Sequence, residues 1–110
     1  MPRGDLLGSL EYIVLLAVVR LGPDAYGMTV RREIEKRVGR NLSIGAVYAT
    51  LDRLEAKGLV SSTIGEPTSA RGGRAKRHFR IAAAGARALK TSDDAIRRMS
   101  AGLKRTWENA

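Results

Sequence analysis

Residue types that usually carry out catalysis are scarce in this sequence. The chain contains a single histidine, His78, and no cysteine, so a Cys–His pair is excluded and a Ser–His pair has one candidate base. His78 lies among lysines and arginines, and nothing beside it supplies a carboxylate to orient its ring. Asp93 and Asp94 are adjacent on a predicted helix and therefore point in different directions. We expect no catalytic residues, no metal site and no cofactor.

Basic side chains give the strongest chemical signal. The 110 residues carry a formal net charge of +9, and no acidic residue occurs between Glu66 and Asp93. Seven cations lie in that interval: Arg71, Arg74, Lys76, Arg77, Arg80, Arg87 and Lys90. A surface of one sign concentrates polyanions. Many basic proteins nevertheless bind no specific polyanion, so the interpretation depends on the elements that carry these cations.

The stretch TSARGGRAKRHFRI, residues 68–81, is compatible with a linker, a phosphate-binding loop or a β-hairpin. Its GGR lacks the GxxxxGK[ST] pattern of a phosphate loop. The alternation in KRHFRI (76–81) is typical of a strand, and the β-branched LVSSTI (59–64) is a suitable partner. We predict a hairpin, with residues 68–75 as a mobile tip.

Two helices joined by a short turn are predicted ahead of the hairpin. Residues 26–38 place an apolar side chain at every fourth position and end at Gly39. Ser43 is a good N-cap for a helix that runs to about Lys57, where Gly58 ends it. This pair has the outline of a helix-turn-helix.

The first and last segments are predicted helices that need a partner. Residues 6–21 are apolar nearly all round, as in a helix covered by its own domain and by a neighbour. From about Ala82 to the end, apolar side chains recur close to an a/d seam. The alternative is that this last helix folds back on its own core. The predicted dimer interface consists of Leu10, Ile13, Leu89, Ile96, Met99, Leu103 and Trp107.

The order of helices and hairpin is that of a winged helix domain, mainly α with a small antiparallel β-hairpin. We assign residues 1–82 to this domain and 83–110 to a C-terminal dimerisation helix. The longest apolar run, Tyr12 to Val19, is far short of the roughly 20 residues that span a membrane. We therefore expect a cytoplasmic protein with no membrane association.

The third helix is the element most suited to read DNA. In helix-turn-helix proteins the second helix of the pair enters the major groove through its N-terminal end, and here that end is built from small residues. Tyr48 either reaches the DNA backbone or packs at the edge of the core, and Arg31, Arg32 and Arg53 either contact phosphates or form a solvated face. The predicted DNA-binding residues are Ser43, Gly45, Ala46, Tyr48, Ala49, Arg53, Arg71, Arg74, Lys76 and Arg77. The first two turns lack Arg, Asn and Gln. Specificity must therefore come partly from the predicted hairpin, which is the wing of a winged helix domain, or from DNA shape.

Three segments resemble the short type of PadR family transcriptional regulator: GSLEYIVLLAVVRLGPDAYGMTV, LSIGAVYATLDRLEAKGLV and GGRAKRHFRIAAAG. The resemblance covers roughly residues 5–90, and AAAG stands where a threonine often begins the last helix. It implies a homodimer formed by the first and last helices, with the third helix and the wing on operator DNA. It also implies that Tyr48 matches a characteristic tyrosine, and that a small aromatic or phenolic effector releases the DNA.

These observations favour a homodimeric repressor on an inverted-repeat operator, with two third helices about 34 Å apart. The effector hypothesis places an aromatic ligand against Tyr12, Ile96, Met99 and Trp107. The alternative is that these side chains only pack the dimer seam. Two other classes of protein stay open: a non-specific, nucleoid-like or RNA-binding basic protein, and a protein-interaction module whose last helix binds a different partner.

Overall fold

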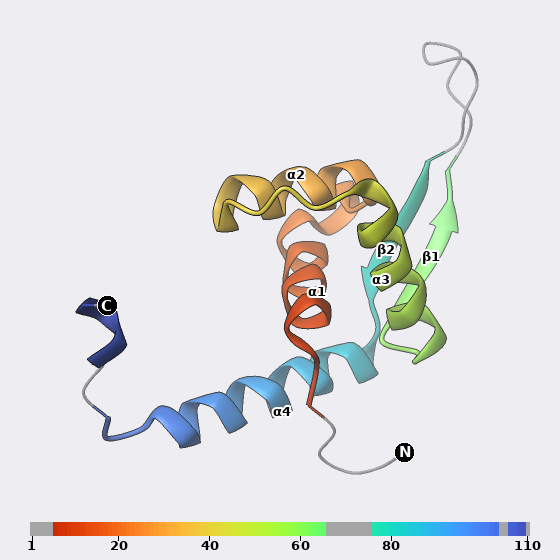
Figure 1. Cartoon of the computed structure of the whole chain (residues 1–110). Coiled ribbons are helices and arrows are strands. Elements are labelled where there is room, and N and C mark those ends of the chain that lie inside the picture. The colour runs from red at the N-terminus through yellow and green to blue at the C-terminus, as the bar shows by residue number, and fades with distance from the viewer. Residues whose placement is uncertain (1–5, 66–75, 104–105, 110) are drawn as a thin grey trace.

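The computed structural model describes residues 6–65, 76–103 and 106–109, and Figure 1 draws the others as a thin grey trace. The elements follow one another as α1 (Ser9–Leu21), a 3₁₀ turn (Gly22–Asp24), α2 (Gly27–Val38), α3 (Ile44–Ala56), β1 (Val60–Ile64), β2 (Arg77–Ile81), α4 (Ala83–Ser100) and a second 3₁₀ turn (Thr106–Asn109). The predicted fold class is confirmed, since the described residues form four helices and a two-stranded antiparallel sheet. No helix in these ranges is long and apolar enough to cross a membrane.

One apolar core holds α1, α2, α3 and the hairpin together. The side chains that the helical periodicity assigned to the core of α2 and α3 are buried: Val30, Ile34, Val47, Leu51 and Leu54. Helix α1 crosses between α2 and α4 (Figure 1), and it begins at Ser9 rather than at the predicted residue 6. Its Val14 and Leu15 are fully buried, whereas Leu16 and Val19 stay exposed. The apolar surface of α1 therefore exceeds what this chain covers.

The turn between α2 and α3 is shaped by Gly39 and Ser43. Gly39 ends α2 in the left-handed region at φ 77°, which a residue without Cβ adopts readily. The Ser43 hydroxyl accepts a hydrogen bond from the Ala46 N–H at 3.0 Å, so the predicted N-cap of α3 is confirmed.

The hairpin is fastened to the chain between α1 and α2. Strands β1 and β2 pair from Val60↔Ile81 to Ile64↔Arg77. A further antiparallel bridge joins Tyr26 to His78, and the Phe79 N–H donates to the Ala25 carbonyl at 2.8 Å. The Phe79 ring is buried in the core. The base of the wing is thus held in a fixed position relative to the helices.

The start of α4 packs closely against Leu59, the residue that precedes β1. A Cβ atom on Gly85 would lie 2.1 Å from the Leu59 carbonyl oxygen and 2.8 Å from Cγ1 of Ile81. The Ala82 N–H donates to the same Leu59 carbonyl at 2.9 Å. Ala82 provides no side-chain cap for α4. The glycine of the AAAG sequence instead allows the helix to approach Leu59 closely.

The prediction that the last helix continues to the C-terminus is wrong. Helix α4 ends at Ser100, Ala101 is extended, and Gly102 takes a φ of 79°. This left-handed residue turns the chain, so Leu103 and Trp107 lie beyond the helix and not on its apolar stripe. In Figure 1, α4 extends past the other helices and carries the 3₁₀ turn near the C-terminus away from them.

Candidate nucleic-acid interface

The first two turns of α3 carry short side chains on their solvent-facing side. Ser43, Gly45 and Ala49 are exposed there, and Ala46 is half-buried. The opposite side of the helix is anchored by buried side chains that include Val47 and Leu51. The structure therefore brings together the small residues predicted to contact DNA. The side chains at these four positions are short, and the longer Ile44 beside them is 37% exposed. A nucleic acid backbone or base edge can therefore approach the helix closely at the short residues.

Tyr48 packs its ring against the start of α2. A Cβ atom built on Gly27 would lie 2.3 Å from Cζ and 2.5 Å from the hydroxyl oxygen of Tyr48. Glycine at position 27 is therefore required for the ring to occupy this place. The Tyr48 side chain is half-buried, which agrees with the packing alternative, while a contact of its hydroxyl with DNA stays a prediction.

Arg31 closes the turn that presents α3. Its Nε donates to the Leu42 carbonyl at 2.7 Å, and its Nη2 donates to Oδ1 of Asn41 at 2.9 Å. The sequence indicated a phosphate contact or a solvated side chain at this position, and it gave no sign of this turn contact. Arg31 thereby supports the two residues that lead into the Ser43 cap.

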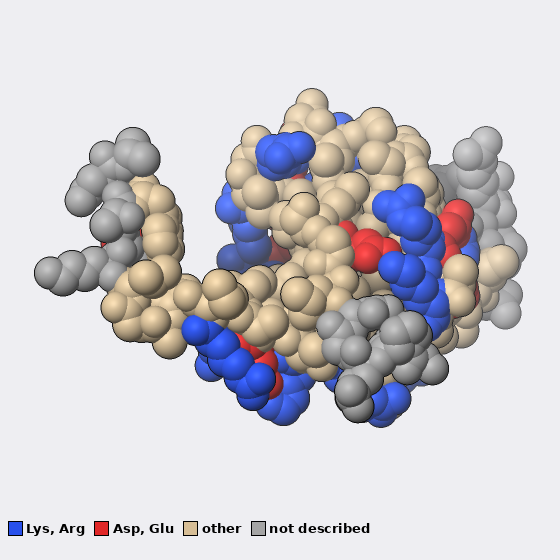
Figure 2. Space-filling view, turned by 60° about the horizontal axis from the view of Figure 1, so that its bottom comes forward, with Lys and Arg blue, Asp and Glu red and all other residues tan. Residues whose placement is uncertain are grey.

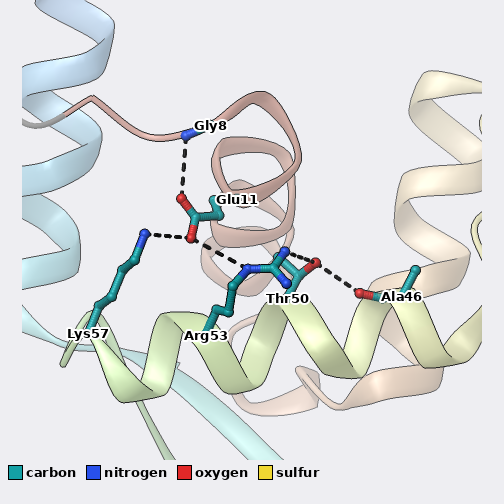
Figure 3. Close-up of polar contacts among 6 residues, drawn as sticks. All are labelled: Gly8, Glu11, Ala46, Thr50, Arg53 and Lys57. Atoms are coloured by element: carbon teal, nitrogen blue, oxygen red, sulfur yellow. Dashed lines mark hydrogen bonds and ion pairs between the residues drawn. The ribbon is translucent and has the colours of Figure 1, made fainter.

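Glu11 of α1 connects to the C-terminal half of α3, as Figure 3 shows. One carboxylate oxygen lies 2.8 Å from Nζ of Lys57 and 3.9 Å from Nε of Arg53. Nη2 of Arg53 also donates to the Thr50 hydroxyl at 3.2 Å. The other carboxylate oxygen of Glu11 accepts from the Gly8 N–H at 3.4 Å. Arg53, predicted as a phosphate ligand, is thus held along α3 and remains partly open to solvent.

Glu11 is buried although it is charged. The hydrogen bond donated by Lys57 is the main cause that lowers the pKa of Glu11 below its ordinary value of 4.5; burial opposes this effect. Because the folded-state pKa is lower than the unfolded one, the carboxylate stabilises the fold above pH 4.5. That contribution is lost as the pH falls through the lowered pKa.

Glu11→Gln should lower the free energy of unfolding by about 1 kcal/mol at pH 7, since the amide cannot pair with the two cations. The difference between variant and wild type should shrink as the pH is lowered below 4.5. Urea unfolding at pH 7 and at pH 3 measures both quantities. Glu35→Gln, at an exposed glutamate of α2, is the control. An equal effect of the two substitutions, or a pH-independent loss, would contradict this role for Glu11.

The base of the wing is held by aromatic and cationic contacts. Nζ of Lys76 donates to the Tyr26 hydroxyl at 3.2 Å and lies 4.4 Å from the centre of that ring. Tyr26 meets His78 edge to face at 5.4 Å, and Nδ1 of His78 lies 3.0 Å from the Pro23 carbonyl oxygen. His78 thus has a structural position and no catalytic partner among the described residues. The predicted tip, residues 68–75, with Arg71 and Arg74, lies outside the described residues.

Arg77 of β2 faces α3. Its Nη1 donates to Oδ1 of Asp52 at 2.9 Å, Nη2 pairs with Glu55, and Nε donates to the Ser62 hydroxyl at 3.2 Å. The Asp52 hydrogen bond is the largest influence that raises the pKa of Arg77. The Ser62 hydroxyl, which donates to Glu55 at 2.7 Å, is the first cause that lowers the pKa of Glu55. Arg77 and Glu55 are therefore charged at neutral pH.

The predicted effector residues do not share one hollow within a single chain. Tyr12 lines a hollow with Leu89 between α1 and α4, and its hydroxyl donates to Oδ1 of Asp93 at 3.4 Å. Burial is the main cause that raises the pKa of Tyr12. Ile96 and Met99 line a second hollow, and Trp107 lines neither of the two.

The predicted dimer residues divide into two groups. Leu10, Ile13 and Leu89 are half-buried at the edge of the core of this chain. Ile96, Met99, Leu103 and Trp107 are exposed. The second group consists of the large apolar side chains at the far end of α4 and beyond it.

A three-helix body, a third helix with short exposed side chains and an adjoining hairpin form a winged helix fold, which in other proteins binds DNA. The sequence model of the transcriptional regulator PadR-like family matches residues 15–91, and the chain belongs to this family. Among curated proteins, none matches the sequence. The family match confirms the resemblance seen in the sequence.

Solved structures share the same fold. A PadR family transcription regulator from Clostridium difficile R20291 is 23% identical with a TM-score of 0.64, over 81% of this chain and 91% of that one. A PadR-like transcriptional regulator from Bacillus cereus ATCC 14579 is 20% identical with a TM-score of 0.67, over 83% and 84%. RosR of H. salinarum is 20% identical with a TM-score of 0.69, over 94% and 86%.

Proposed function

We propose that this regulator is a homodimeric repressor that inserts the N-terminal end of α3 into the major groove of an inverted-repeat operator. The observation that carries the proposal is the exposed, small-residue surface formed by Ser43, Gly45 and Ala49. A helix with such a surface can lie close to the base edges, because the side chains at these three positions are short. The remaining specificity then depends on the wing and on DNA shape.

The far half of α4 supports the homodimer. Ile96 and Met99 are 56% and 81% exposed and belong to the C-terminal end of α4, which finishes at Ser100. In Figure 1, α4 extends past the other helices. Figure 2 shows that the arm formed by α4 has charged side chains along one edge and uncharged surface beside them. Leu16 and Val19 of α1 are also exposed. A second copy supplies matching apolar surface for both helices through a twofold axis.

The small aromatic effector belongs to the same proposal. Within one chain, Tyr12 lies in a different hollow from Ile96 and Met99. We place an effector that contacts all three where two chains meet. Trp107 is the only tryptophan of the chain, so its fluorescence would report an aromatic compound bound beside it.

Selection from a pool of random DNA fragments tests the proposed function. The dimer should enrich fragments that contain an inverted repeat, and it should keep them bound in a mobility-shift assay when unrelated competitor DNA is added in excess. Binding should weaken steeply with salt because the cations of the protein displace counterions from the phosphates. Equal binding to every fragment would instead identify a nucleoid-like protein. A reporter gene placed downstream of the selected fragment should be transcribed less when the protein is present.

A further inference from the structure

Arg77 was predicted to contact DNA, and the structure gives its guanidinium three protein acceptors. These are the carboxylates of Asp52 and Glu55 on α3 and the hydroxyl of Ser62 on β1. The guanidinium also stacks on the Phe79 ring, 4.7 Å from its centre. Each of its three nitrogens therefore donates to a protein acceptor.

The charges around Arg77 argue against a phosphate at this position. One guanidinium and two carboxylates give the cluster a net charge of −1. The Asp52 side chain is 59% exposed, and it follows Ala49 by three residues, on the same side of α3. A phosphate that approached Arg77 would meet the Asp52 carboxylate as well. The cluster lowers the affinity for a phosphate at this place compared with an unpaired arginine.

The same contacts join β2 to α3, two elements that are not consecutive in the chain. Arg77 is the first residue of β2 and follows Lys76, with which the described part of this strand's approach begins. Asp52 and Glu55 are 25 and 22 residues away on α3. The arginine thereby adds a side-chain connection between the wing and the helix that carries Ala49.

We infer that Arg77 is a positioning residue, which clamps the wing to α3, and that it is not a phosphate ligand. The inference rests on the proposed function, because it assumes that wing and α3 contact the same DNA. The neighbouring residue, Lys76, has fewer protein contacts than Arg77. Its ammonium group is held only by the Tyr26 ring and hydroxyl in the described part of the chain, so it can turn to a phosphate.

Arg77→Lys, Arg77→Ala and Lys76→Ala, titrated with salt on the selected DNA, test the inference. Lysine keeps the charge but cannot hold three acceptors, so both Arg77 variants should lose affinity to a similar extent, about tenfold. Neither should change the slope of log K against log salt concentration, since no phosphate contact is lost. Lys76→Ala should flatten that slope by about 0.9, the value for one phosphate contact. Wild-type affinity in Arg77→Lys, with a flattened slope in Arg77→Ala, would overturn the clamp.

Unfolding of the free protein separates the clamp from the proposed function. The effects of Arg77→Lys and Glu55→Gln on the urea midpoint should be clearly non-additive, because the two side chains share one interaction. Additive effects would overturn the clamp whatever the protein binds. A wild-type protein that enriches no DNA, together with non-additive unfolding, would instead refute the proposed function and leave the clamp in place.

Discussion

Glutamate at both Ile96 and Met99 should yield a folded monomer whose affinity for the selected DNA is at least about a hundredfold lower than that of the wild type. Both side chains are more than half exposed in the single chain, so their replacement costs little within one protomer. In a symmetric dimer each substitution occurs twice, and four carboxylates would have to be buried in the seam. A monomer then binds each half-site independently and loses the gain from linked binding.

The matched control places two glutamates at the same spacing near the start of α4. Ala83 and Ala86 are exposed, so Ala83→Glu with Ala86→Glu adds the same charge to the same helix outside the predicted seam. Sedimentation equilibrium should give a dimer for the wild type and this control, and a monomer for the Ile96 and Met99 variant. A dimer in all three, or a wild-type monomer that binds the selected DNA with full affinity, would contradict the proposed interface.

Ala49→Glu should lower the affinity for the selected DNA by about a hundredfold, with the fold intact. Ala49 is exposed in the second turn of α3, and a carboxylate there would face base edges and phosphates at short range. Glutamate is a good helix former, so α3 should remain helical. The mobility shift measures the affinity, and circular dichroism measures the helix content.

Ala86→Glu is the control for this substitution, since it adds one carboxylate to an exposed alanine of α4. Its effect on DNA affinity should be no larger than the general change in net charge produces. Similar affinities of the Ala49 and Ala86 variants would show that the N-terminal end of α3 does not lie on the DNA.

The sequence was sufficient to predict the elements whose signals are local. The four-residue spacing of Val30 and Ile34, the Ser43 cap and the alternation around Phe79 each depend on neighbours in the chain. The structure confirms the helices and the hairpin at these places. Helix α4 was predicted too long because Leu103 and Trp107 continue the apolar spacing, while the local conformation of Gly102 interrupts the helix.

The partners of Glu11 and Arg77 could not be predicted, because they depend on contacts between distant residues. Lys57 lies 46 residues from Glu11 in the sequence, and nothing in the spacing pairs them. Arg77 was predicted to contact DNA because it lies in a basic stretch, yet it pairs with two acidic residues of α3. The close approach of Gly85 to Leu59 is equally non-local. Composition indicated a polyanion ligand, and only the fold shows which cations have protein partners.

The most direct test of this account is a hydroxyl-radical footprint of the wild-type protein on the selected DNA. Two copies of α3 in successive major grooves should protect two half-sites whose centres are about 10 base pairs, or 34 Å, apart. The protection should be symmetric about the centre of an inverted repeat, and Ala49→Glu should abolish it. A single protected half-site, or uniform protection without a fixed position, would contradict a dimer that reads its operator through α3.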